Sequence, residues 1–236
     1  NFPAGRSIAG KLYSDEGVTP LSGKDVSLSL NGGAWAGSGV TDAGGQYVVS
    51  GISAASLTGG TVVTLYVDGA TEDAVTVTLG SGGSMTGISL YQNRLIVRSE
   101  SGSAAVTDTH LGAAKLSGGS DADVAAIIDA ASPTAVTVAS GKELLVWTGD
   151  TFTPGGQVTA DDYDINGTLT LGSNAFTVNG NFDATGGSFT TTGTGTFAAS
   201  SGTKTLTSNG SHFQNLKYTG AGGLQLVQNL NLSGAL

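Results

Sequence analysis

The sequence predicts an all-β protein in which a β-sandwich is followed by a parallel β-helix or solenoid, with one short helix between the two parts. Two observations carry this prediction. Glycine accounts for 39 of the 236 residues, while only 11% of the residues are charged. Thr and Val favour extended backbone, and Gly and Asn favour turns. The second observation is a regular glycine spacing in the last quarter of the chain.

Five glycines in this quarter each begin a short unit that ends in an apolar residue. They are Gly180, Gly187, Gly195, Gly202 and Gly210, and they are separated by 7, 8, 7 and 8 residues. Each step has room for one strand and one turn, and three steps span about 22 residues, the length of one solenoid repeat. We expect these glycines at corners that need a positive φ. The residues expected to face inward are Phe176, Val178, Phe182, Phe189, Phe197, Leu206, Phe213, Leu216, Tyr218, Leu224, Leu226, Leu230 and Leu232.

Residues 1–92 contain short strand patterns with turn signals between them, which is typical of a sandwich. Strands are expected at 7–13, 25–30, 61–67 and 74–79, and residues 41–49 read as a turn that enters a strand.

Two stretches of this part, 10–26 (GKLYSDEGVTPLSGKDV) and 41–47 (TDAGGQY), resemble the prealbumin-type immunoglobulin-like domains of bacterial surface proteins. These are the carboxypeptidase-regulatory-like and Cna-B domains. The resemblance implies an immunoglobulin-like sandwich over residues 1–92.

Residues 93–133 are expected to connect the two parts. The segment 90–98 reads as a strand that joins them, and 120–131 is the one expected helix. Ser120 can cap this helix, acidic residues occupy its first turn, and Pro133 is expected to end it. Its apolar face would consist of Val124, Ile127, Ile128 and Ala131.

Strand patterns resume in residues 134–236, at 135–138, 143–147, 165–171 and 176–182, before the glycine series. The repeat in residues 178–216 resembles the β-solenoid segments of very large bacterial cell-surface proteins, such as adhesins and autotransporter-like proteins. This resemblance implies an extended extracellular part.

Composition excludes several classes of function. The formal net charge is −9, and the nine Lys and Arg residues are scattered, which argues against nucleic-acid binding. No apolar run approaches the length of a membrane span. The absence of cysteine excludes thiolate chemistry and fits a secreted protein. Because neither a signal peptide nor an initial Met is present, we expect a mature or excised segment of a longer protein.

Carboxylates are the richest source of candidate site residues. Asp161, Asp162 and Asp164 precede an expected strand, and Asp121 and Asp123 lie near the expected helix. Such clusters can hold calcium through oxygen ligands, and paired carboxylates can cleave glycosides. Solvated turns explain the same pattern, so all three interpretations stay open, and no other cofactor is expected.

The resemblance to Cna-B-type domains also implies a candidate isopeptide crosslink. Lys11 would supply the amine from an early strand and Asn93 the carboxamide from a late one. Glu72 or Asp73 would be the acid between them. No local motif fixes this trio.

The leading hypothesis is a non-enzymatic component of an extracellular fibre, sheet or adhesin stalk. Its partners would be copies of itself or other surface proteins, reached through open sheet edges and exposed ends of the stack. The alternative is a carbohydrate-binding or carbohydrate-cleaving β-helix, with glycans as partners. Trp35, Trp147 and Tyr163 would be its aromatic platforms.

Overall fold

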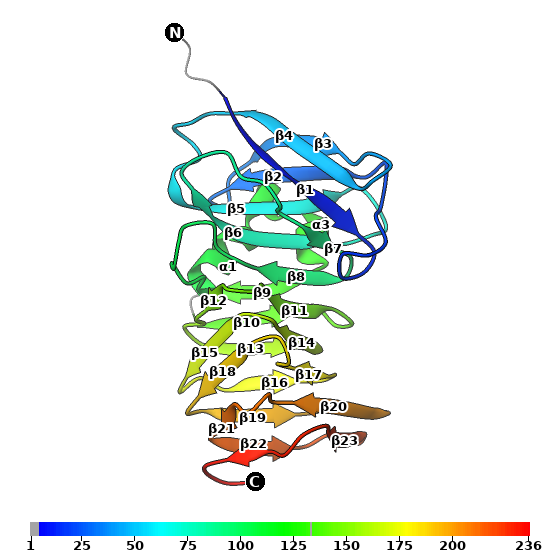
Figure 1. Cartoon of the computed structure of the whole chain (residues 1–236), viewed down its shortest axis with the longest axis vertical. Helices are drawn as coiled ribbons and strands as arrows, with labels where there is room; N and C mark the ends of the chain where they lie inside the picture. The colour runs from blue at the N-terminus through cyan, green and yellow to red at the C-terminus, as the bar shows by residue number, and fades with distance from the viewer. Residues whose placement is uncertain (1–4, 133) are drawn as a thin grey trace.

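The computed structural model describes residues 5–132 and 134–236, and these residues form an elongated all-β fold (Figure 1). Its large sheets are mostly parallel. The prediction of an all-β protein is therefore confirmed. Pro133, the expected end of the helix, lies outside the described residues.

Two sheets enclose a first hydrophobic core near one end of the molecule. A three-stranded sheet of order β4-β1-β7 lies on one side, and β3, β2, β5 and β6 lie on the other. The sequence patterns predicted most of these strands but not β3, whose residues WAGSGV do not alternate. The bounds are β1 Arg6–Tyr13, β2 Asp25–Leu30, β3 Trp35–Val40, β4 Gln46–Ile52, β5 Gly59–Asp68, β6 Val75–Ser81, β7 Leu90–Tyr91 and β8 Arg94–Val97.

The strands β5 and β6 are buried on both faces. Val63 and Leu65 of β5 point into the first core, while Val62 and Tyr66 point into the second, larger core. This explains why β5 is a nearly continuous apolar run, since a strand covered on both sides needs no polar face. The sheet continues past the expected boundary between residues 92 and 93, because β6 pairs in parallel with β8.

The expected helix over residues 120–131 is wrong in extent. Ser120, the expected cap, is instead the last residue of a separate short helix, only Ala122–Ala125 (α3) is helical after it, and Ile128–Ser132 forms strand β9. Asp121 caps α3 as an acceptor for the Asp123 amide. Burial of Ile127 and Ile128 in the second core and antiparallel pairing of β9 with β10 then override the helical pattern. The structure also contains two helices that were not expected, α1 (Asp108–Lys115) and α2 (Ser117–Ser120).

From β10 onward the strands come in groups of three, and each group stacks in parallel on the one before it. The stack extends away from the first core toward the opposite end of the molecule (Figure 1). The bounds are β10 Ala135–Val138, β11 Glu143–Val146, β12 Thr151–Phe152, β13 Gln157–Ala160, β14 Asp162–Ile165, β15 Thr168–Gly172, β16 Phe176–Val178, β17 Phe182–Asp183, β18 Ser188–Thr191, β19 Thr194–Phe197, β20 Thr203–Thr207, β21 His212–Phe213, β22 Asn215–Tyr218, β23 Gly223–Leu226 and β24 Asn231–Leu232.

One sheet runs the whole length of the molecule, in the order β23-β20-β17-β14-β11-β8-β6-β5-β2-β3. Its register aligns one inward row across all ten strands. This row consists of Leu226, Leu206, Phe182, Tyr163, Leu144, Leu95, Val75, Tyr66, Ser27 and Ser38.

Phenylalanine rings fill the core of the stack. The Phe189 and Phe213 ring centroids are 4.6 Å apart, and those of Phe182 and Phe189 are 5.1 Å apart. Most residues expected to face inward are buried, as predicted. Tyr218 and Leu226, in the last group of strands, are instead 41% and 47% exposed.

The glycines of the spaced series serve two different purposes. Gly202 and Gly210 have positive φ values of 67° and 78°, as expected for corners. Gly187 is needed for a different reason, because an added Cβ would lie 2.0 Å from the carbonyl oxygen of Gly167 in the preceding layer. The expectation of a positive φ is therefore incomplete, since close contact between layers also selects glycine.

Gly187→Ala should lower the free energy of unfolding by about 2 kcal/mol or more, because the layers must separate to admit the methyl group. Urea denaturation would measure the loss. Gly59→Ala is the matched control, since its Cβ would meet no atom within 4 Å. Equal effects of the two substitutions would contradict the contact argument.

The chain should melt in one calorimetric transition, because β5 contributes side chains to both cores and neither core can open alone. Leu65→Ala, in the first core, should then shift the whole transition to lower temperature. Two separated transitions, with only one shifted, would show that the cores fold independently.

Candidate functional site

An acidic cleft of about 300 Å³ lies on the outward face of the long sheet. Strands β11 and β14 supply three of its side chains, Glu143, Asp162 and Asp164, and the loop after β1 supplies Glu16. Alternation along the strands turns these residues outward, while Leu144, Tyr163 and Ile165 between them point into the core. The complete lining is Glu16, Glu143, Asp162, Tyr163, Asp164, Asn166, Asn181 and Asp183.

Three carboxylates converge in this cleft. Ligand oxygens of Glu16, Glu143 and Asp164 lie within 4.8 Å of one another. Burial, together with the negative charges of Glu16 and Glu143, raises the pKa of Asp164 to about 7. Burial also raises the pKa of Glu143, although Arg94 opposes this shift through an ion pair of 2.7 Å.

A second carboxylate cluster lies where α3 meets the end of β5. It contains Asp68, Asp121 and Asp123, again with ligand oxygens within 4.8 Å of one another. The Gly69 amide donates to Asp123 Oδ2 at 2.8 Å, and Ser27 Oγ donates to Asp68 Oδ2 at 2.8 Å. Burial raises the pKa of Asp123, and the nearby carboxylates of Asp121 and Asp68 add to the effect.

The two clusters account for three of the five aspartates that the sequence marked as calcium candidates. Each cluster joins a residue from the first 92 positions to residues from the later part of the chain. Three carboxylates in such an arrangement have the oxygen chemistry that calcium prefers. Glu16, Glu143 and Asp68 were not expected, because no local motif links them to the aspartates.

The remaining two candidates, Asp161 and Asp162, act between layers of the stack. Asp161 Oδ2 accepts from the Gly141 amide at 2.5 Å, and its Oδ1 accepts from Asn179 at 3.0 Å. Asp162 Oδ1 accepts from the backbone amide of Asn181 at 2.5 Å. Their carboxylates are thus engaged in hydrogen bonds that hold successive layers together.

The residues of the implied crosslink are only partly brought together. Lys11 is exposed on β1, and Glu72 forms an ion pair of 2.6 Å with Lys24. Asn93 Oδ1 accepts from Lys142 Nζ at 2.7 Å, and the same amine pairs with Asp73 at 2.8 Å. The crosslink stays a prediction, and the amine in contact with Asn93 is that of Lys142.

The three expected aromatic platforms differ in exposure. Tyr163 is only 1% exposed and donates to the carbonyl oxygens of Val158 and Thr177. Trp147 is stacked beneath the Arg98 guanidinium, 4.7 Å from the ring centroid. Only Trp35, on β3, is largely exposed. Of the three, only Tyr163 lines the acidic cleft, and its ring is buried.

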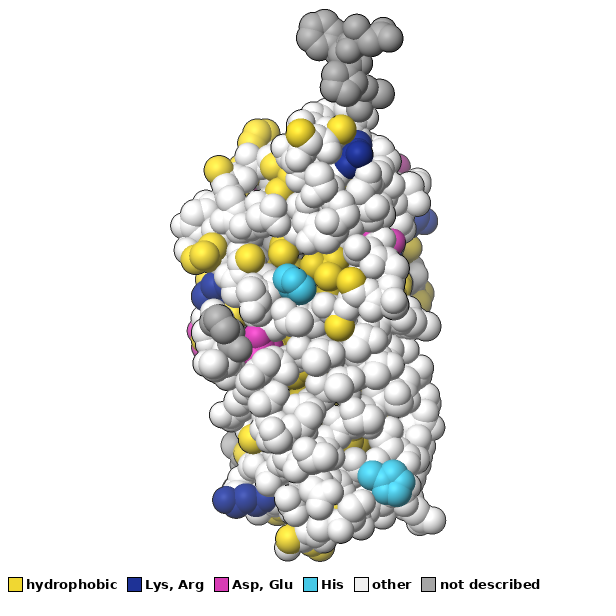
Figure 2. All heavy atoms as spheres, turned by 90° about the vertical axis from the view of Figure 1, so that its left-hand side faces the viewer, with side chains coloured by type: hydrophobic (Ala, Val, Ile, Leu, Met, Phe, Trp, Pro, Cys, Tyr) yellow, Lys and Arg dark blue, Asp and Glu magenta, His cyan; other side chains and the backbone are white. Residues whose placement is uncertain are grey.

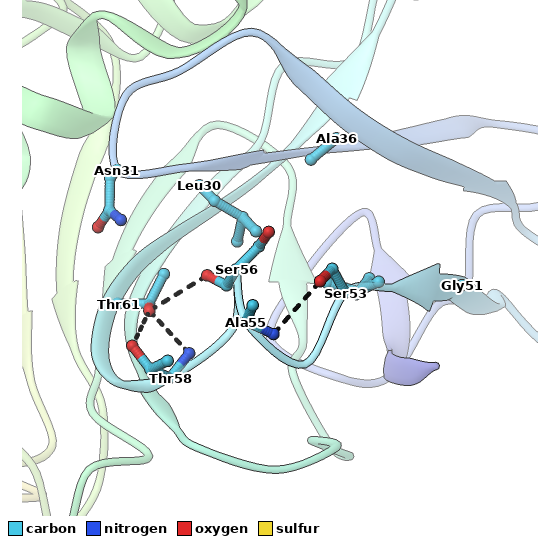
Figure 3. A pocket seen from close by; sticks show the side chains of 10 residues that line it. Leu30, Asn31, Ala36, Gly51, Ser53, Ala55, Ser56, Thr58 and Thr61 are labelled. Carbon is cyan, nitrogen blue, oxygen red and sulfur yellow. Dashed lines mark hydrogen bonds between the residues drawn. The ribbon is translucent and has the colours of Figure 1, made fainter. Parts of the chain in front are cut away.

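A second pocket, of about 550 Å³, lies between β3 and the segment that connects β4 to β5 (Figure 3). Its lining contains no ionisable side chain. The Thr61 hydroxyl organises one side, where it accepts from the Thr58 amide at 3.0 Å and donates to the Ser56 carbonyl oxygen. The complete lining is Leu30, Asn31, Ala36, Gly51, Ile52, Ser53, Ala55, Ser56, Thr58 and Thr61.

Asp164→Asn should raise the melting temperature at pH 8 by about 3 °C or more and change it little at pH 4. The pKa of Asp164 is higher in the folded chain, about 7, than in an unfolded chain, about 4. Stability is therefore lost as the pH rises between these values, and the amide removes that loss. Thermal melts at the two pH values would measure the difference.

Asp129→Asn, on the exposed part of β9, is the control and should leave both melting temperatures unchanged. An equal gain for Asp164→Asn at both pH values would contradict the assignment. Calcium bound in the cleft would stabilise the natural chain at pH 8 but not this variant, so a calcium titration extends the same experiment.

Comparisons with known proteins find no match to this chain among protein-family models, curated proteins or solved structures. In the part of the chain that the structure describes, none of the helices has the length and apolar character that crossing a membrane requires.

Proposed function

We propose that this chain is a non-enzymatic structural component of an extracellular surface assembly, and that it associates with copies of itself. One observation carries the proposal. A single ten-stranded sheet extends along the whole molecule, and its edge strand β3 has a ladder partner on one side only. Edge strands offer unpaired backbone groups to other chains, so this architecture suits a building block of a fibre, sheet or stalk.

The same proposal includes the fold types of the two parts of the chain, an immunoglobulin-like sandwich and a β-solenoid. The first core between two sheets is what an immunoglobulin-like sandwich of the prealbumin type would contain. The parallel groups of three strands are what a β-solenoid would contain, and stability in such a stack comes from contact between neighbouring layers. The two parts would share β5 and β6 and act as one rigid rod.

The composition of the surface supports an extracellular location. The chain has no cysteine, and few charged side chains appear on the face in Figure 2, where uncharged polar groups and backbone dominate. Because the chain has no thiol groups, its stability does not depend on a reducing environment.

The acidic cleft is the observation that favours the alternative, a carbohydrate-binding or carbohydrate-cleaving protein. Asp164, with its raised pKa, has the property of a general acid. Against this function, Tyr163 is buried and Trp147 is covered by Arg98, so the cleft has no free aromatic platform. The structural function therefore has the stronger support.

Light scattering and electron microscopy over a range of concentrations test the proposal. We expect the mean mass to rise with concentration and linear assemblies to be visible. A single monomeric species at every soluble concentration would overturn it. Retention of that monomer on immobilised polysaccharide, lost in Asp164→Asn, would favour the alternative instead.

A further inference from the structure

The pocket of about 550 Å³ beside β3 lies where three strands of the first part depart from regular pairing (Figure 3). On β3, Ala36 is an extra residue between two that pair with adjacent positions of β2. On β4, the stretch that contains Gly51 has one residue more than the facing stretch of β1. On β5, the stretch that contains Thr61 has one residue more than the facing stretch of β6. All three of these residues line the pocket.

Such β-bulges are concentrated at sheet edges and beside functional sites, where they redirect side chains and interrupt the backbone ladder. An edge position can account for the bulges of β3 and β4, because each of these strands ends its sheet. It cannot account for the bulge of β5, which is paired on both sides, with β2 and with β6. The property that the three bulges share is therefore the pocket, which indicates a binding site shaped by the strands themselves.

The lining of this pocket offers hydrogen-bonding groups but no charge, since none of its residues is ionisable. Asn31 Oδ1 accepts from the Val62 amide at 2.9 Å, which leaves the Nδ2 group of Asn31 as a donor. The bond to Ser56 in Figure 3 uses the backbone carbonyl oxygen, so the exposed hydroxyl of Ser56 is left for a ligand. The extra residue Ala36 adds backbone groups that the ladder does not pair.

The floor of the pocket is apolar. Ile52 is 4% exposed and belongs to the first core, and Leu30 packs against the same core. The volume lies within the range of small-molecule sites, about 300–1,000 Å³. A matching ligand presents hydroxyl groups at its edges and C–H groups on one face, as sugars do. A charged ligand would lose its hydration without meeting an opposite charge in the lining.

We propose that this pocket binds an uncharged saccharide. The inference goes beyond the proposed structural function, and neither depends on the other. Strands β3 and β4 lie at the end of the molecule away from the stack (Figure 1), so the site would attach that end to neutral glycan chains.

Amide NMR spectra of the whole chain test the site with three neutral probes, maltose, cellobiose and N,N′-diacetylchitobiose. At least one should shift the amide resonances of residues 53–58, with a dissociation constant of about 1 mM or less. Absence of shifts with all three probes, or shifts confined to the acidic cleft, would overturn the proposal. Tighter binding of the anionic digalacturonate at the same residues would overturn the assignment of an uncharged ligand.

Two substitutions distinguish the pocket from other surfaces. Ala55 is exposed and lines the pocket, so Ala55→Trp should block it and abolish the shifts. Val18→Trp is the matched control, because Val18 is an 80% exposed loop residue outside the lining, and it should leave binding unchanged. Ser56→Ala removes one hydroxyl and should weaken binding about three- to tenfold.

The spectra of the unbound variants show whether each one folds. If Ala55→Trp does not fold, the affinity of Ser56→Ala decides the question. Binding to folded Ala55→Trp as tight as to the natural chain, or an unchanged affinity of Ser56→Ala, would overturn the proposed site.

Discussion

The fold depends on the strands β5 and β6, which lie between two hydrophobic cores. Alternate residues of β5 face opposite cores, so this strand is apolar on both sides. The neighbouring β6 contributes Val75, Val77 and Leu79 to the second core and buries Thr76 and Thr78 on its other face. The same pair is where antiparallel pairing on one side gives way to parallel pairing on the other. Contacts on both faces therefore fix the position of these two strands and prevent a shift of their register. The rest of the sheet extends from them in both directions.

Much of this architecture follows from patterns in the sequence. The alternation in 25–30 predicted β2, and the glycine spacing predicted repeated short strands whose phenylalanines turn inward. The strand β3 could not be predicted, because its glycines show no alternation and its position comes from pairing with β2. The segment 128–132 has a helical pattern, but pairing with β10 makes it a strand, which only the tertiary fold determines.

The candidate site was predictable only in part, for a related reason. Asp164 and Glu143 both belong to strands, and a parallel register would have placed them near one another. Glu16 reaches them from a distant loop through an ion pair with Arg94, an interaction with no local signal. Neighbouring aspartates also differ in their contacts, because Asp161 only bonds between layers, Asp162 does so and also lines the cleft, and Asp164 lines the cleft.

The layers tolerate unequal lengths of chain. Partners in the inward row are separated by 19 residues from Tyr163 to Phe182, by 24 from Phe182 to Leu206, and by 20 from Leu206 to Leu226. The strands keep their alignment because the additional residues are placed in the corners. A loop inserted at such a corner would leave the hydrogen-bonded ladders intact. The corners are thus positions where evolution or an engineer can vary the lateral surface of the rod, including by grafting recognition peptides, without changing its backbone.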